Sequence, residues 1–315
     1  MRELTLLEGH QDRSRQEESP VQERTFLAQL VLVLLQLDLA LARGRYGRWL
    51  GGVPPQLNAN PDASFLLREL RHPLLIWQQK KAGGPTVVPI SVDVSSSLRV
   101  VAITGPNTGG KTVTLKSIGL AALMARAGML LPCSGQPSLP WYAQILADIG
   151  DEQSLQQSLS TFSGHVKRIG RILSALASGP APALVLLDEV GAGTDPSEGT
   201  ALASALLKAL ADRARLTIAT THFGELKALK YSDSRFENAS VAFNAETLSP
   251  TYDLLWGIPG RSNALAIASR LGFDPDVLNQ AQELLAPAAE GEVNSVIRGL
   301  EEQRPRQQSA AEDAA

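Results

Sequence analysis

The sequence predicts an α/β fold in which a mixed, mostly parallel sheet is flanked by helices. From about residue 61, short apolar stretches alternate with helical patterns. Stretches of this kind that lack the apolar–polar alternation of a half-exposed strand are residues 98–104, 143–149, 183–189 and 216–222. Such strands are typical of sheets that helices cover on both faces. A glycine-rich loop between the first of these stretches and a helical pattern indicates the same fold class.

The composition limits the protein to a few broad classes. With 315 residues, 44% of them hydrophobic, the chain can form one large domain or two modest ones. A net charge of −3 provides no overall positive field to attract nucleic acid. The single cysteine, Cys133, excludes an internal disulfide bond and a cysteine-rich zinc site. Because residues 1–20 also lack the apolar core of a signal peptide, we expect a cytoplasmic protein.

The first 50 residues look helical throughout, and the sequence Gly51-Gly52-Val53-Pro54-Pro55 ends that pattern. Residues 26–42 are apolar enough to resemble a membrane span, but this run has only 17 residues and places Asp38 within it. We therefore expect a buried helix in a helical layer and no membrane segment.

Three parts of the chain follow from these patterns. Residues 1–52 form a helical segment, and residues 61–287 form the α/β domain. Within that domain, residues 236–243 and 251–257 look like a late antiparallel strand pair, and a helix pair closes it. Residues 288–315 are expected to be a disordered tail or linker because their end is polar and lacks aromatic residues.

The most informative stretch is LRVVAITGPNTGGKT, residues 98–112, in which an apolar strand ends in Gly105-x-x-x-x-Gly110-Lys111-Thr112. With the helical pattern that follows, this is the strand–loop–helix order of a phosphate-binding loop. Glycines let backbone N–H groups turn toward an anion, and the helix start adds a positive dipole end. Lys111 is expected to reach the β- and γ-phosphates, and the Thr112 hydroxyl suits Mg²⁺. The alternative is a glycine-rich turn that binds nothing.

An acidic pair, Asp188 and Glu189, ends the apolar stretch 183–189 as in a Walker B strand. Asp188 would hold Mg²⁺ directly or through water. Glu189 would orient and deprotonate the attacking water. An ordinary acidic strand end is the alternative, and the phosphate-binding loop upstream favours the catalytic interpretation.

The segment after the acidic pair predicts a glycine turn and a helix start. Asp195, Pro196 and Glu198 fit the N-cap, first and third positions of a helix that runs to about residue 212. Capping alone explains both acidic residues. The other interpretation is that this turn approaches a partner subunit, and the residues leave both open.

Two further segments place polar side chains for phosphate contact. His222 ends the stretch 216–222, and ligands of open α/β sheets bind at the carboxyl ends of strands, so His222 can reach a γ-phosphate. Hydroxyl residues in 158–163, among them Ser160, precede another helical pattern, and hydroxyls at a helix N-terminus make an anion site. If that segment lies far from its own phosphate-binding loop, its target is a phosphate on another subunit. Plain capping is the alternative.

These elements together resemble the MutS family of ABC-type DNA-repair ATPases, from about residue 71 to residue 285 and weakly over residues 20–50. GPNTGGKT is similar to the Walker A sequence of the family, and LSTF to its signature loop. LLDEVGAGTDPSEG and TTHFGEL are similar to its Walker B, D-loop and H-loop. GIPGRSNA and GGKTVTLKSIGL resemble the MutS-two branch most, which is linked to suppression of recombination and to DNA binding.

The resemblance implies an ATPase that uses ATP and Mg²⁺ and works as a head-to-tail homodimer. Each nucleotide would lie between the P-loop of one subunit and the Ser160 loop of the other, and Val88-Pro89-Ile90 would lie near the adenine. The metal would be held by Thr112 and Asp188, and the catalytic residues would be Lys111, Glu189 and His222. The nucleotide-binding residues would be Gly105, Pro106, Asn107, Thr108, Gly109, Gly110, Lys111, Thr112, Thr114 and Ser160.

The sequence also departs from the family in three ways. Of its long lever and clamp domains only a helical remnant, residues 1–52, is visible. No Phe-x-Glu module for reading mismatched DNA is visible, and no Smr nuclease domain follows before Ala315. Endonuclease activity is therefore not expected of these residues, and DNA contact is a family property that they need not share.

Two hypotheses of different classes follow. In the first, the chain is the ATP-hydrolysing, dimeric motor or switch domain of a MutS-like DNA-binding protein that acts in DNA repair or suppression of recombination. In the second, it is a nucleotide-dependent dimerisation module with little turnover and no DNA binding of its own. A transporter or chromosome-structure ATPase is disfavoured, because LSTF replaces the LSGGQ-type signature and no long coiled-coil or membrane partner segment is predicted.

Overall fold

The computed structural model describes residues 2–105, 110–150, 161–244, 249–257 and 264–285. The chain divides into two compact units, Met1–Trp49 and Leu50–Ala315. The first unit consists of one helix, α1 (Arg2–Leu50), which extends into the first residue of the second unit. This long helix agrees with the prediction that the first 50 residues are helical.

The apolar stretch of α1 is exposed, so the expectation of a buried helix is wrong for this chain. Its large apolar side chains from Phe26 to Leu41 are 45–64% exposed, because the first unit has no second element to cover them. Over Arg24–Leu50 this helix, alone among the described ones, is long and apolar enough to cross a bilayer. Length and composition are weak evidence, since core helices and signal sequences share them.

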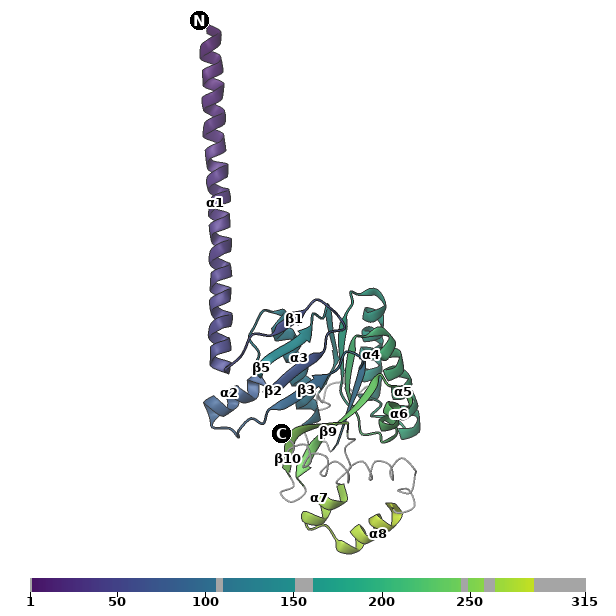
Figure 1. Ribbon diagram of the computed structural model, residues 1–315. Coiled ribbons are helices and arrows are strands. Elements are labelled where there is room, and N and C mark those ends of the chain that lie inside the picture. The colour runs from purple at the N-terminus through teal and green to yellow at the C-terminus, as the bar shows by residue number, and fades with distance from the viewer. Residues whose placement is uncertain (1, 106–109, 151–160, 245–248, 258–263, 286–315) are drawn as a thin grey trace, which may run out of the picture. The chain divides into compact units, whose positions relative to one another are not determined.

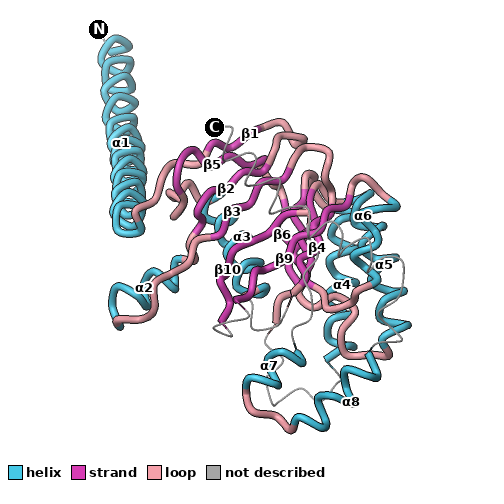
Figure 2. The backbone as a smooth tube through the Cα atoms, turned by 60° about the horizontal axis from the view of Figure 1, so that its bottom comes forward, coloured by secondary structure: helices cyan, strands magenta, loops and turns pink. Residues whose placement is uncertain are grey.

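A six-stranded sheet forms the centre of the second unit, in the order β10–β9–β4–β8–β7–β6 (Figures 1 and 2). All neighbouring strands are parallel except β10, which runs antiparallel to β9. Every residue of β4, β7 and β8 is buried, which confirms strands covered on both faces. The bounds are β4 (Val100–Thr104), β6 (Gln144–Asp148), β7 (Ala183–Leu187), β8 (Leu216–Thr220), β9 (Phe236–Asn244) and β10 (Ser249–Trp256).

Helices pack on both faces of this sheet. On one face Leu207 and other apolar residues of the helices meet Val185 and Leu187 of β7 in one buried cluster. Strand residues alternate between faces, so Leu186 points to the opposite face, where α3 packs. Gly119 of α3 permits a close approach, because a Cβ there would lie 2.5 Å from Leu186 Cδ1. The helices are α3 (Lys111–Arg126), α4 (Thr161–Ser178), α5 (Pro196–Arg213) and α6 (Leu229–Ser232), with a 3-10 turn at Glu225–Ala228.

A second, four-stranded sheet precedes and interrupts the first along the chain, and the sequence did not predict it. Its order is β1–β5–β2–β3, and the indole Nε1 of Trp256 in β10 donates to the Ser91 carbonyl of β3 at 3.2 Å. Burial alternates along β3, so that sheet has a covered face and a more open one. The bounds are β1 (Gln56–Asn58), β2 (Phe65–Leu70), α2 (Pro73–Ala82), β3 (Ile90–Val94) and β5 (Ser134–Pro140).

Two helices close the described part of the chain, α7 (Ala264–Arg270) and α8 (Pro275–Leu285), as predicted. The Asp274 carboxylate caps α8 by accepting the N–H groups of Asp276 and Val277 at 2.9 and 3.3 Å. A carboxylate at this position satisfies N–H groups that have no partner inside a helix.

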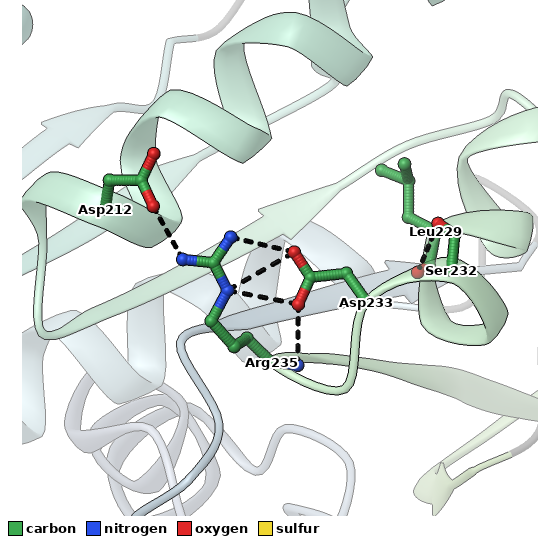
Figure 3. Close-up of polar contacts among 5 residues, drawn as sticks. All are labelled: Asp212, Leu229, Ser232, Asp233 and Arg235. Carbon is green, nitrogen blue, oxygen red and sulfur yellow. Dashed lines mark hydrogen bonds and ion pairs between the residues drawn. The ribbon is translucent and has the colours of Figure 1, made fainter.

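The amino ends of the parallel strands carry several arginines, each held by acceptors. Arg215 is buried and donates to the carbonyls of Pro61, Leu98 and Ala63 at 2.5, 2.9 and 3.2 Å. Arg235 bonds to Asp233 and, on α5, to Asp212 (Figure 3). These contacts join the loop before β2, the end of α5 and the starts of β8 and β9.

Candidate active site

The loop after β4 has the backbone that the P-loop pattern requires at both described ends. Gly105 has φ +128° and Gly110, the N-cap of α3, has φ +87°, both in the region that favours glycine. Pro106, Asn107, Thr108 and Gly109, which the sequence assigns to nucleotide, lie outside the described residues. The described ends therefore turn the chain sharply from the sheet into α3.

Lys111 is the first residue of α3 and only 2% exposed. Its Nζ donates to the Gly105 carbonyl at 2.6 Å. Burial lowers the pKa of Lys111 to about 8, although the nearby carboxylates of Glu189 and Asp188 act to raise it. The fold thus brings Lys111 within electrostatic reach of Asp188 and Glu189, as the sequence predicted. Lys111 follows β4 and the acidic pair follows β7, and β8 lies between these two strands.

Thr112 and Thr114 follow on the first turn of α3. Thr112 is partly exposed, whereas Thr114 is buried and donates its N–H to the Gly110 carbonyl at 2.9 Å. Thr114 is one of the residues that line a pocket beside α3, and Thr112 stays accessible from solvent.

The acidic pair is held by Thr220, which lies in the TTHFGEL segment and had no predicted role. Its hydroxyl donates to Asp188 Oδ1 at 2.5 Å and accepts the Glu189 N–H at 2.8 Å. The Asp188 N–H donates to the Asp148 carbonyl at 2.9 Å. Asp188, 6% exposed, is therefore fixed from both neighbouring strands, β8 and β6. A polar residue at the carboxyl end of a buried strand was the signal available.

Glu189 has a left-handed backbone with φ +51°, which is uncommon for a residue with a side chain and often marks functional sites. Its side chain is 29% exposed, and its Oε1 lies 3.4 Å from His222 Nε2. The two residues predicted from separate motifs therefore face one another at the carboxyl end of the sheet.

The turn after Glu189 is packed too tightly for side chains. Gly191 has φ +84°, and a Cβ there would lie 2.7 Å from the Gly199 carbonyl oxygen and from the Phe223 ring.

Asp195 caps α5 by accepting the N–H groups of Ser197 and Glu198 at 2.9 and 3.2 Å. The capping interpretation is thus confirmed for Asp195.

Ser160 lies outside the described residues, and the helix that it precedes, α4, begins at Thr161. Whether Ser160 contacts a phosphate in a partner subunit stays a prediction. The described neighbours of that segment are Gly150 after β6 and the first turn of α4.

A pocket of about 260 Å³ adjoins the P-loop helix. Its walls come from β2, α2, the segment before β3 and α3, and most of them are apolar. His72 is one of its polar lining residues and lies at the N-cap of α2, where its Nδ1 accepts the Leu74 N–H at 3.2 Å. Burial, and then the charge of Lys116, lower the pKa of His72. The lining includes Leu70, His72, Gln78, Val87, Val88, Ile90, Gly110, Val113 and Thr114.

The donor set fits Mg²⁺ bound together with phosphates. Magnesium in nucleotide sites takes one or two protein oxygens and leaves the other positions to phosphates and water. Asp188 and Thr112 offer oxygens of that kind. Among the described residues no group of three or more His, Cys, Asp or Glu side chains could hold a metal ion. A cation cage built from these side chains alone is therefore not found in that part of the chain.

Comparison with known proteins agrees with this geometry. The family model described as MutS domain V matches residues 101–288. The protein called endonuclease MutS2 of Synechocystis sp. is 59% identical over 304 residues, which cover 91% of this chain and 37% of that relative. The proteins of the same name from Symbiobacterium thermophilum and Thermomicrobium roseum are each 46% identical over 88% of this chain.

The extent of these matches differs between the chain and its relatives. This chain spans about a third of the length of the curated relatives that it matches, since 37, 33 and 35% of those proteins are covered. The family match covers more than half of this chain and includes all of β4 except Val100, together with α3, the acidic pair and His222. The chain therefore belongs to the MutS family and carries its domain V, a P-loop ATPase domain.

Proposed function

We propose that this domain binds ATP with Mg²⁺ and hydrolyses it at the carboxyl end of the six-stranded sheet. The observation that carries the proposal is Lys111, a buried cation at a helix start, within electrostatic reach of Asp188 and Glu189. Burying a lysine costs free energy unless an anion compensates it. Asp188 and Glu189 compensate it in part, and a triphosphate in the P-loop would add further negative charge beside Nζ.

Each predicted residue has a separate role in this proposal. Lys111 and the amides of the P-loop stabilise negative charge on the phosphates, and Thr112 and Asp188 hold Mg²⁺, which neutralises phosphate charge when bound. Glu189 orients the attacking water and accepts its proton. His222, 3.4 Å from Glu189, orients that carboxylate and contacts the γ-phosphate. Catalysis of this kind relies on positioning and electrostatics.

The adjoining pocket is the proposed site of the adenine. Val88, Ile90 and Val113 provide apolar walls, and the pocket shares Gly110 and Thr114 with the start of the P-loop helix. A base in this pocket would place its triphosphate over Lys111. The lowered pKa of His72 favours a neutral ring, which suits an uncharged base.

The dimer and the role in DNA metabolism are also proposals. We infer that two copies associate head to tail, so that Ser160 of one completes the site of the other. The relatives are named endonucleases, and this supports a domain that drives a MutS-like protein acting on DNA in repair or suppression of recombination. Nucleotide binding would then set the geometry of the parts that grip DNA.

Glu189→Gln tests the proposed chemistry. The variant should bind ATP with Mg²⁺ about as tightly as the unchanged protein, while steady-state phosphate release falls by about 10²-fold or more. Glu283→Gln on α8 is the control, because Glu283 is exposed and lies outside this site. Native turnover in Glu189→Gln would remove Glu189 as the base. Tight binding without turnover in the unchanged protein would favour the dimerisation module instead.

Mixed subunits test the composite site. Lys111→Ala and Ser160→Ala proteins should each be inactive, and mixing them should restore one working site for each mixed dimer. No recovery in a mixture shown to exchange subunits would contradict the sharing of sites. Binding of the chain to DNA, measured with and without ATP over a salt series, tests the proposed partner.

A further inference from the structure

A three-residue cluster around the buried carboxylate of Asp148 connects α4 to the end of β6, next to the strand end that carries Asp188. The Asp148 carboxylate, 2% exposed at the end of β6, accepts a hydrogen bond from Arg168 Nε through Oδ1. Its other oxygen lies 2.7 Å from His165 Nδ1, and Arg168 Nη2 lies 3.3 Å from the same nitrogen. We call Asp148, His165 and Arg168 the α4 clasp.

The α4 clasp holds an ionised carboxylate in a buried position. Burial alone would raise the pKa of Asp148, yet hydrogen bonds from His165 and Arg168 hold it below its ordinary range. An ionised carboxylate only accepts hydrogen bonds, so both partners act as donors. Such a charge-assisted pair has a narrow geometry, and α4 is therefore fixed in register against the end of β6.

Asp148 also contacts Asp188, the proposed magnesium ligand. The backbone carbonyl of Asp148 accepts the N–H of Asp188 at 2.9 Å. Asp148 thus joins α4, through its side chain, to Asp188, through its backbone. Thr220 holds Asp188 from the opposite strand, so Asp148 and Thr220 fix it from both sides. A shift of α4 would move one of these two supports.

Arg168 further lies between the two described ends of the segment that contains Ser160. A Cβ on Gly150 would be 3.7 Å from Arg168 Nη2, and a Cβ on Gly164 would be 3.5 Å from Nη1. Both distances are ordinary van der Waals contacts, so the guanidinium lies directly beside both glycines. The arginine therefore ties the end of β6 to the first turn of α4.

We propose that Asp148, His165 and Arg168 are positioning residues for ATP hydrolysis, which hold α4 and Asp188 in one register. This inference rests on the proposed function. In this proposal the three residues contact neither the attacking water nor the phosphates of ATP. They act by holding Asp188 in position. Since a misplacement of about 1 Å can reduce turnover about 10²-fold, loosening this register should slow hydrolysis more than binding.

Arg168→Gln and Arg171→Gln make a matched pair on the same helix, because Arg171 is exposed and takes no part in the clasp. Arg168→Gln should lower kcat by about tenfold or more and change KM and ATP affinity by less than about threefold. Arg171→Gln should leave both unchanged. Equal kcat values for the two variants would overturn the proposal.

His165→Asn and His165→Leu provide a readout that a merely structural role would not move. Asparagine can place an amide donor near the position of Nδ1, so His165→Asn should recover most of the kcat that His165→Leu loses. The pair is compared at a temperature where both are folded by circular dichroism. If both variants lose kcat equally, or neither loses it, the positioning role is wrong.

Two controls separate this inference from the proposed function. If the unchanged protein shows no ATP hydrolysis above that of Glu189→Gln, the proposed function fails, and the positioning role falls with it. If hydrolysis depends on Glu189 but is unaltered in Arg168→Gln, only the positioning role is overturned. Should Arg168→Gln not fold, Arg168→Lys, which keeps the charge and loses the planar fork, takes its place with the same expected direction.

Discussion

The two ends of the six-stranded sheet both gather charged side chains, but they use them differently. At the amino end Arg215 donates to three carbonyls, and Arg235 bonds to two carboxylates. At the carboxyl end Lys111 is buried with a lowered pKa, and Glu189 has a left-handed backbone. The arginines at the amino end fix loops in place. The carboxyl end holds a buried lysine and a residue with an unfavourable backbone conformation.

This contrast shows why a charged cluster alone does not indicate a functional site. The amino end is hollowed over about 510 Å³ and lined by four arginines, Arg99, Arg213, Arg215 and Arg235. Its described ion pairs, including that of Arg99 with Asp62, are internal to the fold. The carboxyl end differs because its groups are aimed by neighbours such as Thr220. The features that set the carboxyl end apart are the left-handed backbone of Glu189 and a buried lysine beside two carboxylates.

The largest expected effect comes from the support of the acidic pair. Thr220→Val should reduce kcat for ATP by roughly 10- to 100-fold, because the hydroxyl that holds both Asp188 and Glu189 is lost. Thr217→Val on the same strand is the control, since the buried Thr217 hydroxyl has no hydrogen-bond partner among the described residues. The measurement is the steady-state kcat for ATP hydrolysis by the two variants. A normal kcat in Thr220→Val would mean that the support is dispensable.

At the amino end the expected effect is on stability and not on turnover. Arg215→Met should lower the free energy of unfolding by about 2–4 kcal/mol, because three backbone carbonyls lose their donor. Arg213→Met, at an exposed position nearby, should change it by less than about 0.5 kcal/mol. Urea unfolding gives both values. If kcat of folded Arg215→Met fell as in Thr220→Val, the separation between the two ends would be lost.

The glycine turn at the carboxyl end should be less tolerant than a glycine elsewhere. Gly191→Ala should cost about 2 kcal/mol of stability, since its φ is positive and its Cβ would meet the Gly199 carbonyl. Gly170→Ala in α4, where no atom lies within 4 Å of the new Cβ, should stabilise by about 0.5–1 kcal/mol. Thermal unfolding distinguishes them. Equal melting temperatures would argue against the packed turn.

The smallest effect is expected at the surface network of Figure 3. The side-chain hydrogen bond from Arg235 holds the pKa of Asp233 below its ordinary range. Any stabilisation is therefore present at neutral pH and is lost as pH falls below about 4, where carboxylates take up protons. Because the side chains of Arg235 and Asp233 are 38% and 21% exposed, water and ions screen the pair, so Arg235→Gln should cost little, and the cost should shrink in high salt. A large, salt-independent loss would contradict a screened pair.

The phosphate-binding strand, the acidic pair and the Asp195 cap could be predicted because their signals are local. A glycine pattern, an apolar strand end or a capping carboxylate acts on neighbours within a few residues. Thr220 and Asp148 escaped prediction because their role depends on which strands lie next to β7. The four-stranded sheet was missed for the same reason, since β1 pairs with β5 across the whole P-loop helix.

The exposure of α1 shows what a local sequence pattern cannot predict. Its apolar pattern fixed a helix correctly, but burial also requires an element to pack against, and the first unit supplies none. What the sequence determined by itself is the strands of the six-stranded sheet, the helices beside them and the candidate residues at strand ends, because these follow from short-range sterics and hydrogen bonding. Only the tertiary structure decided which strands are neighbours, and so which side chains support Asp188 and which arginines are internal clamps. Those outcomes depend on contacts between residues far apart in the chain.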